Sequence, residues 1–490
     1  MKESLKTKTL KGVVWTGLDR ILNQVVQFFI SIVLARLLSP SDYGVLGIMN
    51  VFLGIAGLFV DCGLSAGLLR KKDKTDEDYS TVFWCNLVMS SLCYLFIFFS
   101  SPFIASYYNI DSLKLMLRVL GLILIINALF TVQITRLTSL IDFKSQTKVS
   151  FSSCIISGSI GLYLAYSGWG PWSLVVQQIF AAIYKTFAYW FVSGWHPKFV
   201  FSKKSFASFF SFGSRLLLAS ILGTIYNYIS PLIIGKKYTM SDLGNYTRAD
   251  SFVHLPGGIF QSTFGRVIYP VLISIQDEEI RLREAYKKYL RIITSLVVPT
   301  MLLLAAVSEP LILVLIGEKW KACVPYIMIL AVGWMVDPIV TVNLNIIYVK
   351  GRSDIVLKLE VIKKIIALSI VIFSLQFGVI WLCVGRCVYS YIALVINIWG
   401  CRPFIGMSFF KQVQEVWKMY VGGIVAAVLS FGLNFYIMHY LSLKHSFVLN
   451  VSSLVLASCL GVLIYIGWAY FWDFEIIKEA KFLLLKFFKR

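Results

Sequence analysis

Residues 13–35 read VVWTGLDRILNQVVQFFISIVLA, and this single segment sets the class of protein. It is apolar over enough length to cross a hydrocarbon core, which takes about 20 helical residues. Yet Asp19, Arg20, Asn23 and Gln27 interrupt it at helical spacing, which places polar groups on one face, opposite Val, Ile, Leu and Phe. The segment therefore predicts a transmembrane helix with one face turned away from lipid.

The composition extends this character to the whole chain. Of the 490 residues, 58% are apolar and 14% are charged, whereas a soluble domain carries about 25% charged residues. The net charge is +21, but no basic block interleaved with aromatic residues lies outside the apolar segments, so we expect orientation in an anionic membrane rather than nucleic-acid binding. The nine cysteines include no CxxC pair and the four histidines are scattered, so we predict no metal site and no cofactor.

The apolar segments predict an all-α polytopic membrane protein with about fourteen transmembrane helices. Pro256, Pro270 and Pro310 interrupt the eighth and ninth segments, so kinks, a merger of two segments or a re-entrant helix stay open, and twelve spans is the alternative count. The predicted spans are residues 13–35, 43–62, 80–105, 115–135, 149–166, 171–194, 206–234, 243–272, 289–316, 324–349, 355–376, 379–400, 416–439 and 447–472.

The charges of the loops predict the orientation. If both termini are cytoplasmic, the inward loops and termini hold 30 Lys and Arg, and the outward loops hold 7. Because basic residues favour cytoplasmic loops, this ratio supports fourteen spans with both termini inside the cell. Residues 474–490 mix apolar and basic residues and are too short to span, so we expect an interfacial amphipathic helix there, with a frayed tail as the alternative.

A short motif occurs twice in the chain. Residues 41–44 read SDYG after the first span, and residues 241–244 read SDLG after the seventh, 200 residues later. An even number of spans separates the copies, so the two halves would be parallel repeats, as in two-lobed transporters. We predict two duplicated six-helix lobes at 1–205 and 206–400, followed by two extra helices and the tail at 401–490.

Polar residues inside five predicted spans suggest a shared aqueous cavity. A charged residue at mid-membrane costs about 2.5–3.5 kcal/mol on the insertion scale, so a functional role is expected. Helix–helix adhesion is the alternative for the neutral residues, and local ion pairing is the alternative for the charged ones. The candidate substrate-binding residues are Arg20, Arg215, Arg248, Arg266, Asn23, Gln24, Gln27, Asn227 and His254. The candidates for coupling to H⁺ or Na⁺ are Asp19, Asp61, Asp250 and Asp337. Further positive charge comes from Lys185, Lys363, Lys364 and Arg386.

The segment 34–44, LARLLSPSDYG, resembles the signature after the first span of bacterial polysaccharide (Wzx-type) flippases. These belong to the multidrug/oligosaccharidyl-lipid/polysaccharide transporter superfamily. Residues 243–249, 266–277 and 309–320 also resemble that family, and with the span count the resemblance covers nearly the whole chain.

The resemblance implies a V-shaped pair of lobes with spans one, two, seven and eight facing a cleft. It also implies an undecaprenyl-pyrophosphate-linked oligosaccharide as substrate, moved across the bacterial inner membrane by alternating access. A polysaccharide polymerase would then be a partner, and the last two spans would shelter the polyprenyl tail. Arginines suit contact with the pyrophosphate.

Two other functions stay open. A cation-coupled multidrug exporter of the same superfamily would share the architecture, although organic cations favour an acidic cavity. A membrane polysaccharide polymerase or ligase would need a substantial outer loop, whereas the predicted outward loops have about ten residues or fewer. We therefore expect a transporter rather than an enzyme.

Overall fold

The computed structural model describes residues 5–440, 447–475 and 477, and the part of the chain it describes contains helices and no strand. The side chains of residues 5–14, 16–21, 212, 215–216, 218–219, 222, 261–267 and 440 are not described. The helices are α1 (Leu5–Leu37), α2 (Pro40–Asp61), α3 (Leu64–Arg70), α4 (Asp76–Tyr108), α5 (Asp111–Gly121), α6 (Ile123–Ser139), α7 (Phe143–Tyr166), α8 (Pro171–Ser193), α9 (Lys203–Lys237), α10 (Met240–Ser274), α11 (Glu279–Ala306), α12 (Ser308–Leu315), the 3₁₀ helix η1 (Glu318–Cys323), α13 (Val324–Trp334), α14 (Asp337–Val349), α15 (Ser353–Ser374), α16 (Val379–Ile405), α17 (Phe409–Tyr440) and α18 (Phe447–Phe471).

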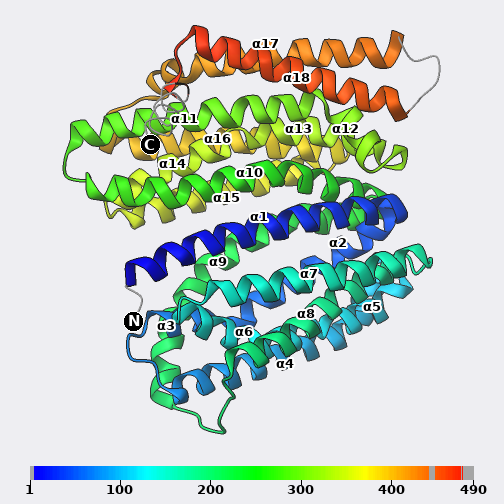
Figure 1. Cartoon of the computed structure of the whole chain (residues 1–490), viewed down its shortest axis with the longest axis vertical. Coiled ribbons are helices and arrows are strands. Elements are labelled where there is room, and N and C mark those ends of the chain that lie inside the picture. The colour runs from blue at the N-terminus through cyan, green and yellow to red at the C-terminus, as the bar shows by residue number, and fades with distance from the viewer. Residues whose placement is uncertain (1–4, 441–446, 476, 478–490) are drawn as a thin grey trace. The chain divides into compact units, whose positions relative to one another are not determined.

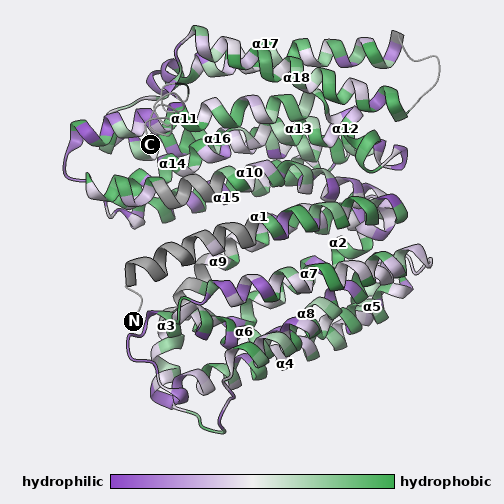
Figure 2. Cartoon of the chain, viewed as in Figure 1, coloured by the Kyte–Doolittle hydropathy of each residue, from purple (hydrophilic) through white to green (hydrophobic). Residues whose placement is uncertain are grey.

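Every predicted span coincides with one helix or with two consecutive helices, and the all-α polytopic class is confirmed. By length and apolar composition, nine helical segments of the described chain could cross a membrane, so the count of fourteen stays a prediction. Figure 2 shows hydrophobic residues along the lengths of the helices and hydrophilic residues mainly at their ends. The predicted amphipathic tail, apart from residues 474, 475 and 477, lies outside the described residues.

The eighth and ninth predicted spans, which contain prolines, are separate in the structure and do not merge. Pro256 and Pro270 both lie inside the single helix α10. Pro310 lies in the first turn of α12, where a missing backbone N–H leaves no helical hydrogen bond unmade. The ninth span is therefore two helices, because α11 ends at Ala306 and α12 begins at Ser308.

The chain divides into two compact units, Met1–Gly244 and Asn245–Arg490. In the first unit, α1 packs along α7 and α7 packs along α8, while α9 packs on α2, α3 and α4 (Figure 1). In the second unit, α11 packs on α17, α17 packs on α18, and α16 packs on α13, α14 and α15. The predicted lobe boundary at 205/206 lies one helix earlier than the division between the units, and the duplication of lobes stays a prediction.

The repeated motif forms the same helix cap in both copies. At the start of α2, the backbone N–H of Ser39 donates to Asp42 at 2.9 Å, and the N–H of Asp42 donates back to Ser39 Oγ at 3.3 Å. At the start of α10, the N–H of Thr239 donates to Asp242 at 3.1 Å, and the N–H of Asp242 donates to Thr239 Oγ1 at 3.1 Å. Each pair is a capping box, which satisfies N–H groups that the first turn leaves unpaired.

The glycines that end the two motifs each lie against the backbone of the residue just before the other motif. A Cβ at Gly44 would lie 1.9 Å from the carbonyl oxygen of Met240, and a Cβ at Gly244 would lie 1.8 Å from that of Pro40. No Cβ atom tolerates such distances, so both positions require glycine. This reciprocal contact lies within the first unit and brings the beginnings of α2 and α10 together.

A buried carboxylate fixes the beginning of α9 to α4. The Asp78 side chain is 1% exposed and accepts hydrogen bonds from Lys71 Nζ at 2.7 Å and from the Thr75 backbone N–H at 2.8 Å. It also accepts one from Ser205 Oγ at 2.7 Å. Because Ser205 lies in the first turn of α9, 127 residues further along the chain, Asp78 ties α9 to the start of α4 and to the loop before it.

The second unit contains a buried polar network around Asn343 of α14. Its Oδ1 atom accepts hydrogen bonds from the Tyr286 hydroxyl at 2.8 Å and from Gln412 Nε2 at 3.3 Å, and the Cys401 thiol lies 2.8 Å away. All four side chains are buried. One amide oxygen therefore connects α11, α14, α16 and α17.

Candidate functional site

A polar pocket lies inside the first unit, between α1, α7 and α8. It has a volume of about 510 Å³, within the range of small-molecule sites, roughly 300–1,000 Å³. Nine of its fifteen lining residues carry an amide or hydroxyl group, although the three helices are otherwise largely apolar. The lining residues are Asn23, Gln27, Ile30, Ser31, Leu34, Tyr43, Ser150, Ser153, Cys154, Ser157, Leu174, Gln177, Gln178, Ala181 and Lys185.

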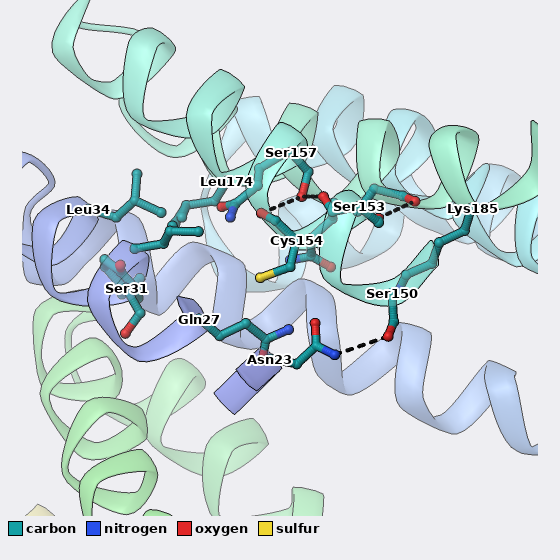
Figure 3. Close-up of a pocket in the computed structure, with 15 residues that line it drawn as sticks. Asn23, Gln27, Ser31, Leu34, Ser150, Ser153, Cys154, Ser157, Leu174 and Lys185 are labelled. Carbon is teal, nitrogen blue, oxygen red and sulfur yellow. Dashed lines mark hydrogen bonds between the residues drawn. The ribbon is translucent and has the colours of Figure 1, made fainter. Parts of the chain in front are cut away.

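Helical spacing places the polar groups on the wall. On α1, Asn23, Gln27 and Ser31 follow one another at intervals of four residues, which keeps them on one face. The serines of α7 and the glutamines and lysine of α8 have similar spacing. Three polar faces therefore meet around one space, and Figure 3 shows these side chains converging on it.

The hydroxyl groups of α7 donate to backbone carbonyls. Ser150 Oγ donates to the carbonyl of Thr147 at 3.2 Å, Ser153 Oγ to that of Ala181 at 3.1 Å, and Ser157 Oγ to that of Ser153 at 2.7 Å. Donation to a carbonyl satisfies the hydroxyl hydrogen and leaves the oxygen as an acceptor. The α7 wall therefore offers mainly acceptors to a ligand.

A hydrogen bond between side chains joins the walls of α1 and α7. Asn23 Nδ2 donates to Ser150 Oγ at 3.0 Å, at the end of the pocket where Lys185 lies (Figure 3). The opposite end holds Leu34 and Leu174 together with the hydroxyl of Ser31 (Figure 3). The apolar side chains of the pocket thus lie away from Lys185.

The fifteen lining residues include one ionisable cation, Lys185, and no carboxylate. A wall of amides and hydroxyls suits the hydroxyl groups of a sugar, since each group can donate or accept a hydrogen bond. The lysine adds attraction for an anion. The same wall offers an organic cation no counter-charge.

The second unit holds a cluster of charged side chains on α10 and α16. Arg386 donates to the Asp250 carboxylate at 2.8 Å and to the Tyr246 hydroxyl at 2.9 Å. His254 lies one turn beyond Asp250 on α10, with Nε2 3.4 Å from the carboxylate, and its ring lies edge-on to Trp334, 4.3 Å between centroids. Two of the predicted site residues, Asp250 and His254, are therefore in contact.

Asp337, another predicted ion-coupling residue, lies near this cluster. It begins α14 and lies within electrostatic reach of Arg386 and Asp250. Arg386 thus faces carboxylates from two helices. The sequence assigned Arg386 only a general contribution of positive charge.

The remaining predicted site residues have varied surroundings. Gln24 is half-buried and does not line the pocket, Asn227 is exposed on α9, and Arg248 is buried with its guanidinium 5.1 Å from the Phe252 ring centre. Asp61 accepts hydrogen bonds from the backbone and hydroxyl of Ser65, which links the end of α2 to α3. The side chains of Asp19, Arg20, Arg215 and Arg266 lie outside the described residues, so the common cationic cavity stays a prediction.

Comparison with known proteins assigns the family. Residues 33–325 match the family described as polysaccharide biosynthesis protein. The chain belongs to this family. The resemblance of residues 34–44 to polysaccharide transporters of the flippase superfamily is thereby confirmed.

Relatives and a solved structure extend the match over most of the chain. The teichuronic acid biosynthesis protein TuaB of Bacillus subtilis (strain 168) is 23% identical over 444 residues, which cover 89% of this chain and 91% of TuaB. The succinoglycan biosynthesis transport protein ExoT of Rhizobium meliloti (strain 1021) is 26% identical over 400 residues, 79% of this chain and 80% of ExoT. The fold is shared with the inward closed conformation of the lipid II flippase MurJ, with a TM-score of 0.73, 14% identity, and 95% and 99% of the two chains covered.

Sequence reasoning found the α1 wall of the pocket and, on the other two helices, only the positive charge of Lys185. It assigned Asn23 and Gln27 of α1, which line the pocket, but it gave no role to the serines of α7 or the glutamines of α8. The signal was present, because Gln177 and Gln178 interrupt an apolar span, and Ser150, Ser153 and Ser157 recur at helical spacing.

Proposed function

We propose that this protein is a flippase that moves undecaprenyl-pyrophosphate-linked oligosaccharide repeat units across the bacterial inner membrane for polysaccharide export. Membership of a family of membrane polysaccharide biosynthesis transporters supports the general class of function. The lipid-linked substrate, the direction from the cytoplasmic to the outer leaflet, and cytoplasmic termini are the parts we add.

The pocket between α1, α7 and α8 is the observation that carries the proposal. Polar groups in a membrane-spanning bundle are costly unless they are paired or face water, so a wall of amides and hydroxyls implies a polar occupant. A glycan supplies many hydroxyl groups that such a wall can bind. Water would occupy the pocket when no glycan is bound.

The protein would accommodate the polar part of the substrate, and the bilayer would accommodate its lipid tail. The sugars and the pyrophosphate cannot enter hydrocarbon, so the protein must replace their hydration with amides, hydroxyls and cations. Arg20, Arg215, Arg248 and Arg266 are proposed to meet the pyrophosphate, because arginine forms paired hydrogen bonds with phosphate oxygens. The polyprenyl tail would stay in lipid, sheltered by α17 and α18, and alternating access would expose the glycan to the other side.

Ion coupling is proposed at the Asp250 cluster. An intramembrane carboxylate paired with Arg386 can exchange that partner for a proton, and His254, 3.4 Å away, can relay the proton. Protonation of Asp250 would release Arg386, so the cluster has two charge arrangements that a conformational cycle could use. Transport that follows an imposed pH gradient and is lost in Asp250→Asn would support this site, whereas Asp250→Asn protein that still follows the gradient would overturn it.

The test of function is flipping of a fluorescent polyprenyl-pyrophosphate oligosaccharide in liposomes that contain the purified protein. We compare Gln27→Leu, which removes an amide from the pocket, with Ser159→Leu, which alters an exposed residue of α7. Loss of two hydrogen bonds at about 0.5–1.5 kcal/mol each predicts a fall in rate at limiting substrate of about fivefold to a hundredfold for Gln27→Leu. Ser159→Leu should flip at the wild-type rate.

Two results would overturn the proposal. If the wild-type protein does not accelerate flipping above empty liposomes, the protein is not a flippase for this class of lipid. If it exports a cationic dye and ignores the glycolipid, the multidrug alternative holds instead.

A further inference from the structure

Arg118 of α5 lies on the face of that helix that no other helix covers. Its neighbours on this face are exposed, among them Lys114 one turn before it and Leu115, which is 57% exposed. The buried residues of α5 lie on the opposite side, where the helix packs on α4 and α8. An arginine within a predicted membrane span is costly unless a partner balances its charge, so its surroundings indicate what it does.

The first partner of Arg118 is the backbone of α4. Pro102 lies inside α4 and has no N–H to donate to the carbonyl four residues earlier, which is that of Phe98. Arg118 Nε donates to this carbonyl at 3.4 Å and to Ser101 Oγ at 3.0 Å, and Ser101 Oγ donates to the same carbonyl at 2.8 Å. One edge of the guanidinium group therefore repairs the gap that the proline leaves in the helix.

The other edge of the guanidinium group has no such use. Its terminal N–H groups, on the two nitrogens beyond Nε, meet no acceptor among the residues that the structure describes. The group also lies 4.1 Å from the centre of the Phe98 ring, a contact that balances only part of its charge. Within the same described residues, neither Arg118 nor Lys114 pairs with a carboxylate. Two neighbouring cations thus remain without a counter-charge from the protein.

The depth of Arg118 in the bilayer follows from the length of α4. Its 33 residues correspond to about 50 Å, whereas the hydrocarbon core is about 30 Å thick. A helix centred on the bilayer therefore extends roughly 10 Å beyond the hydrocarbon at each end. Ser101, which holds Arg118, lies seven residues before the end of α4 at Tyr108, or about 10 Å along the helix. The guanidinium group thus lies at the boundary of the hydrocarbon, where lipid phosphates begin.

We infer that Arg118 and Lys114 form a binding site for the phosphate of an anionic phospholipid, in the leaflet where α4 ends and α5 begins. The terminal N–H groups of Arg118 would bind two oxygens of one phosphate, the paired geometry that arginine favours. Lys114, about 6 Å nearer the helix end, would add a second positive charge at the headgroup. The site does not depend on the proposed function, because it concerns the bilayer and not the transported molecule.

The surroundings of the site favour a membrane phospholipid over other phosphates. Phe99 and Phe103 of α4 are 67% and 78% exposed, and with Leu115 they offer apolar contacts to acyl chains. A free phosphate ion would leave these side chains uncovered. The polyprenyl carrier is the other lipid phosphate, but α4 and α5 contribute no residue to the polar pocket between α1, α7 and α8. A phospholipid reaches this exposed face directly from the bilayer.

The experiment is crosslinking of a photoreactive phosphatidylglycerol to the purified protein in phosphatidylcholine nanodiscs. Peptide mass spectrometry compares the labelling of α4 and α5 with that of α17 and α18, so that the readout is local. The variants are Arg118→Met, Arg118→Lys, Pro102→Ala and the double variant Pro102→Ala/Arg118→Met. Lys148→Met, which alters an exposed lysine of α7, controls for the loss of one positive charge. Unlabelled phosphatidylglycerol, undecaprenyl phosphate and inorganic phosphate serve as competitors, and the melting temperature of each variant is measured.

We expect phosphatidylglycerol to label α4 and α5 in the wild-type protein and in Lys148→Met. Arg118→Met should lower this labelling about tenfold, the value of one hydrogen bond to a charged group, and Arg118→Lys should keep only part of it. Arg118→Met should also melt earlier, because the Phe98 carbonyl loses a donor. The double variant should regain stability, since alanine at position 102 restores the backbone N–H, but its labelling should stay low.

The double variant separates lipid binding from a purely structural role of Arg118. If labelling recovers together with the melting temperature, Arg118 only repairs the helix and the inference is wrong. Labelling of Arg118→Met at the wild-type level would exclude the site directly. Displacement by undecaprenyl phosphate but not by phosphatidylglycerol would assign the site to the carrier lipid, and displacement by inorganic phosphate would reduce it to a site for soluble anions. Either displacement would overturn the inference.

Discussion

Substitution of Gly44 by alanine tests the close contact between the two copies of the repeated motif. The new Cβ would lie 1.9 Å from the carbonyl oxygen of Met240, whereas an ordinary contact requires more than 3 Å. The Cβ is fixed directly to the backbone of α2, and the oxygen belongs to the backbone at the beginning of α10. No side-chain rotation can therefore relieve the contact. The beginnings of α2 and α10 must therefore separate by more than 1 Å.

The expected cost follows from two opposed effects. Overpacking of a tight contact costs typically 1–3 kcal/mol, and a clash between two backbone segments belongs at the upper end, about 3 kcal/mol. Alanine recovers about 1 kcal/mol of helix propensity relative to glycine. The net loss is about 2 kcal/mol, which lowers the melting temperature of a cooperative unit of this size by about 4–8 °C.

The assay is thermal unfolding of the purified protein in detergent, with Gly57→Ala as the control. Gly57 lies on the same helix α2, but a Cβ there would meet no atom within 4 Å. Gly57→Ala should melt at or slightly above the wild-type temperature, because it gains propensity without a clash. If Gly44→Ala has the same melting temperature as Gly57→Ala, the argument that this contact requires glycine is refuted.

Further substitutions probe three groups of paired polar side chains by thermal unfolding. Asp78→Asn should destabilise the first unit by about 2 kcal/mol, because it removes a charged acceptor, and protease cleavage near residue 200 should increase with it. Arg386→Gln should cost about 2–4 kcal/mol by leaving Asp250 without its cation, and the double variant Arg386→Gln/Asp250→Asn should recover more than half of that loss, as a coupling cycle would show. Asn343→Leu should cost about 2–5 kcal/mol by leaving two donors unsatisfied, whereas Tyr286→Phe should cost about 1 kcal/mol; equal losses would contradict the network.

The helices were predictable from sequence because the bilayer imposes a single length rule. Each apolar segment of about 20 residues became helical, and the paired motifs at residues 41–44 and 241–244 became equivalent helix starts. Breaks within a span were harder to predict, since Pro256 and Pro270 stay inside the single helix α10 while Pro310 lies just after a break, in the first turn of α12. Helix continuity depends on packing as well as on proline.

The partners of the polar residues were not predictable, because periodicity identifies a polar face and not the face it meets. Asp250 and Arg386 are 136 residues apart, and only the fold brings them to 2.8 Å. Asp61 has the same intramembrane appearance in the sequence, yet its carboxylate accepts from Ser65 and links α2 to α3. The physical difference is the neighbouring group, which a single sequence does not contain.

The donors and acceptors of the pocket would determine how a bound ligand is oriented. The hydroxyl hydrogens of Ser153 and Ser157 already point to backbone carbonyls, so the α7 wall can receive donors from a ligand but gives few in return. The α8 wall supplies the donors that α7 lacks, from Gln177, Gln178 and the ammonium of Lys185. A ligand that presents hydroxyl hydrogens to α7 and oxygen acceptors to α8 would satisfy both walls at once. A ligand with acceptors alone would leave the acceptors of the α7 wall unused.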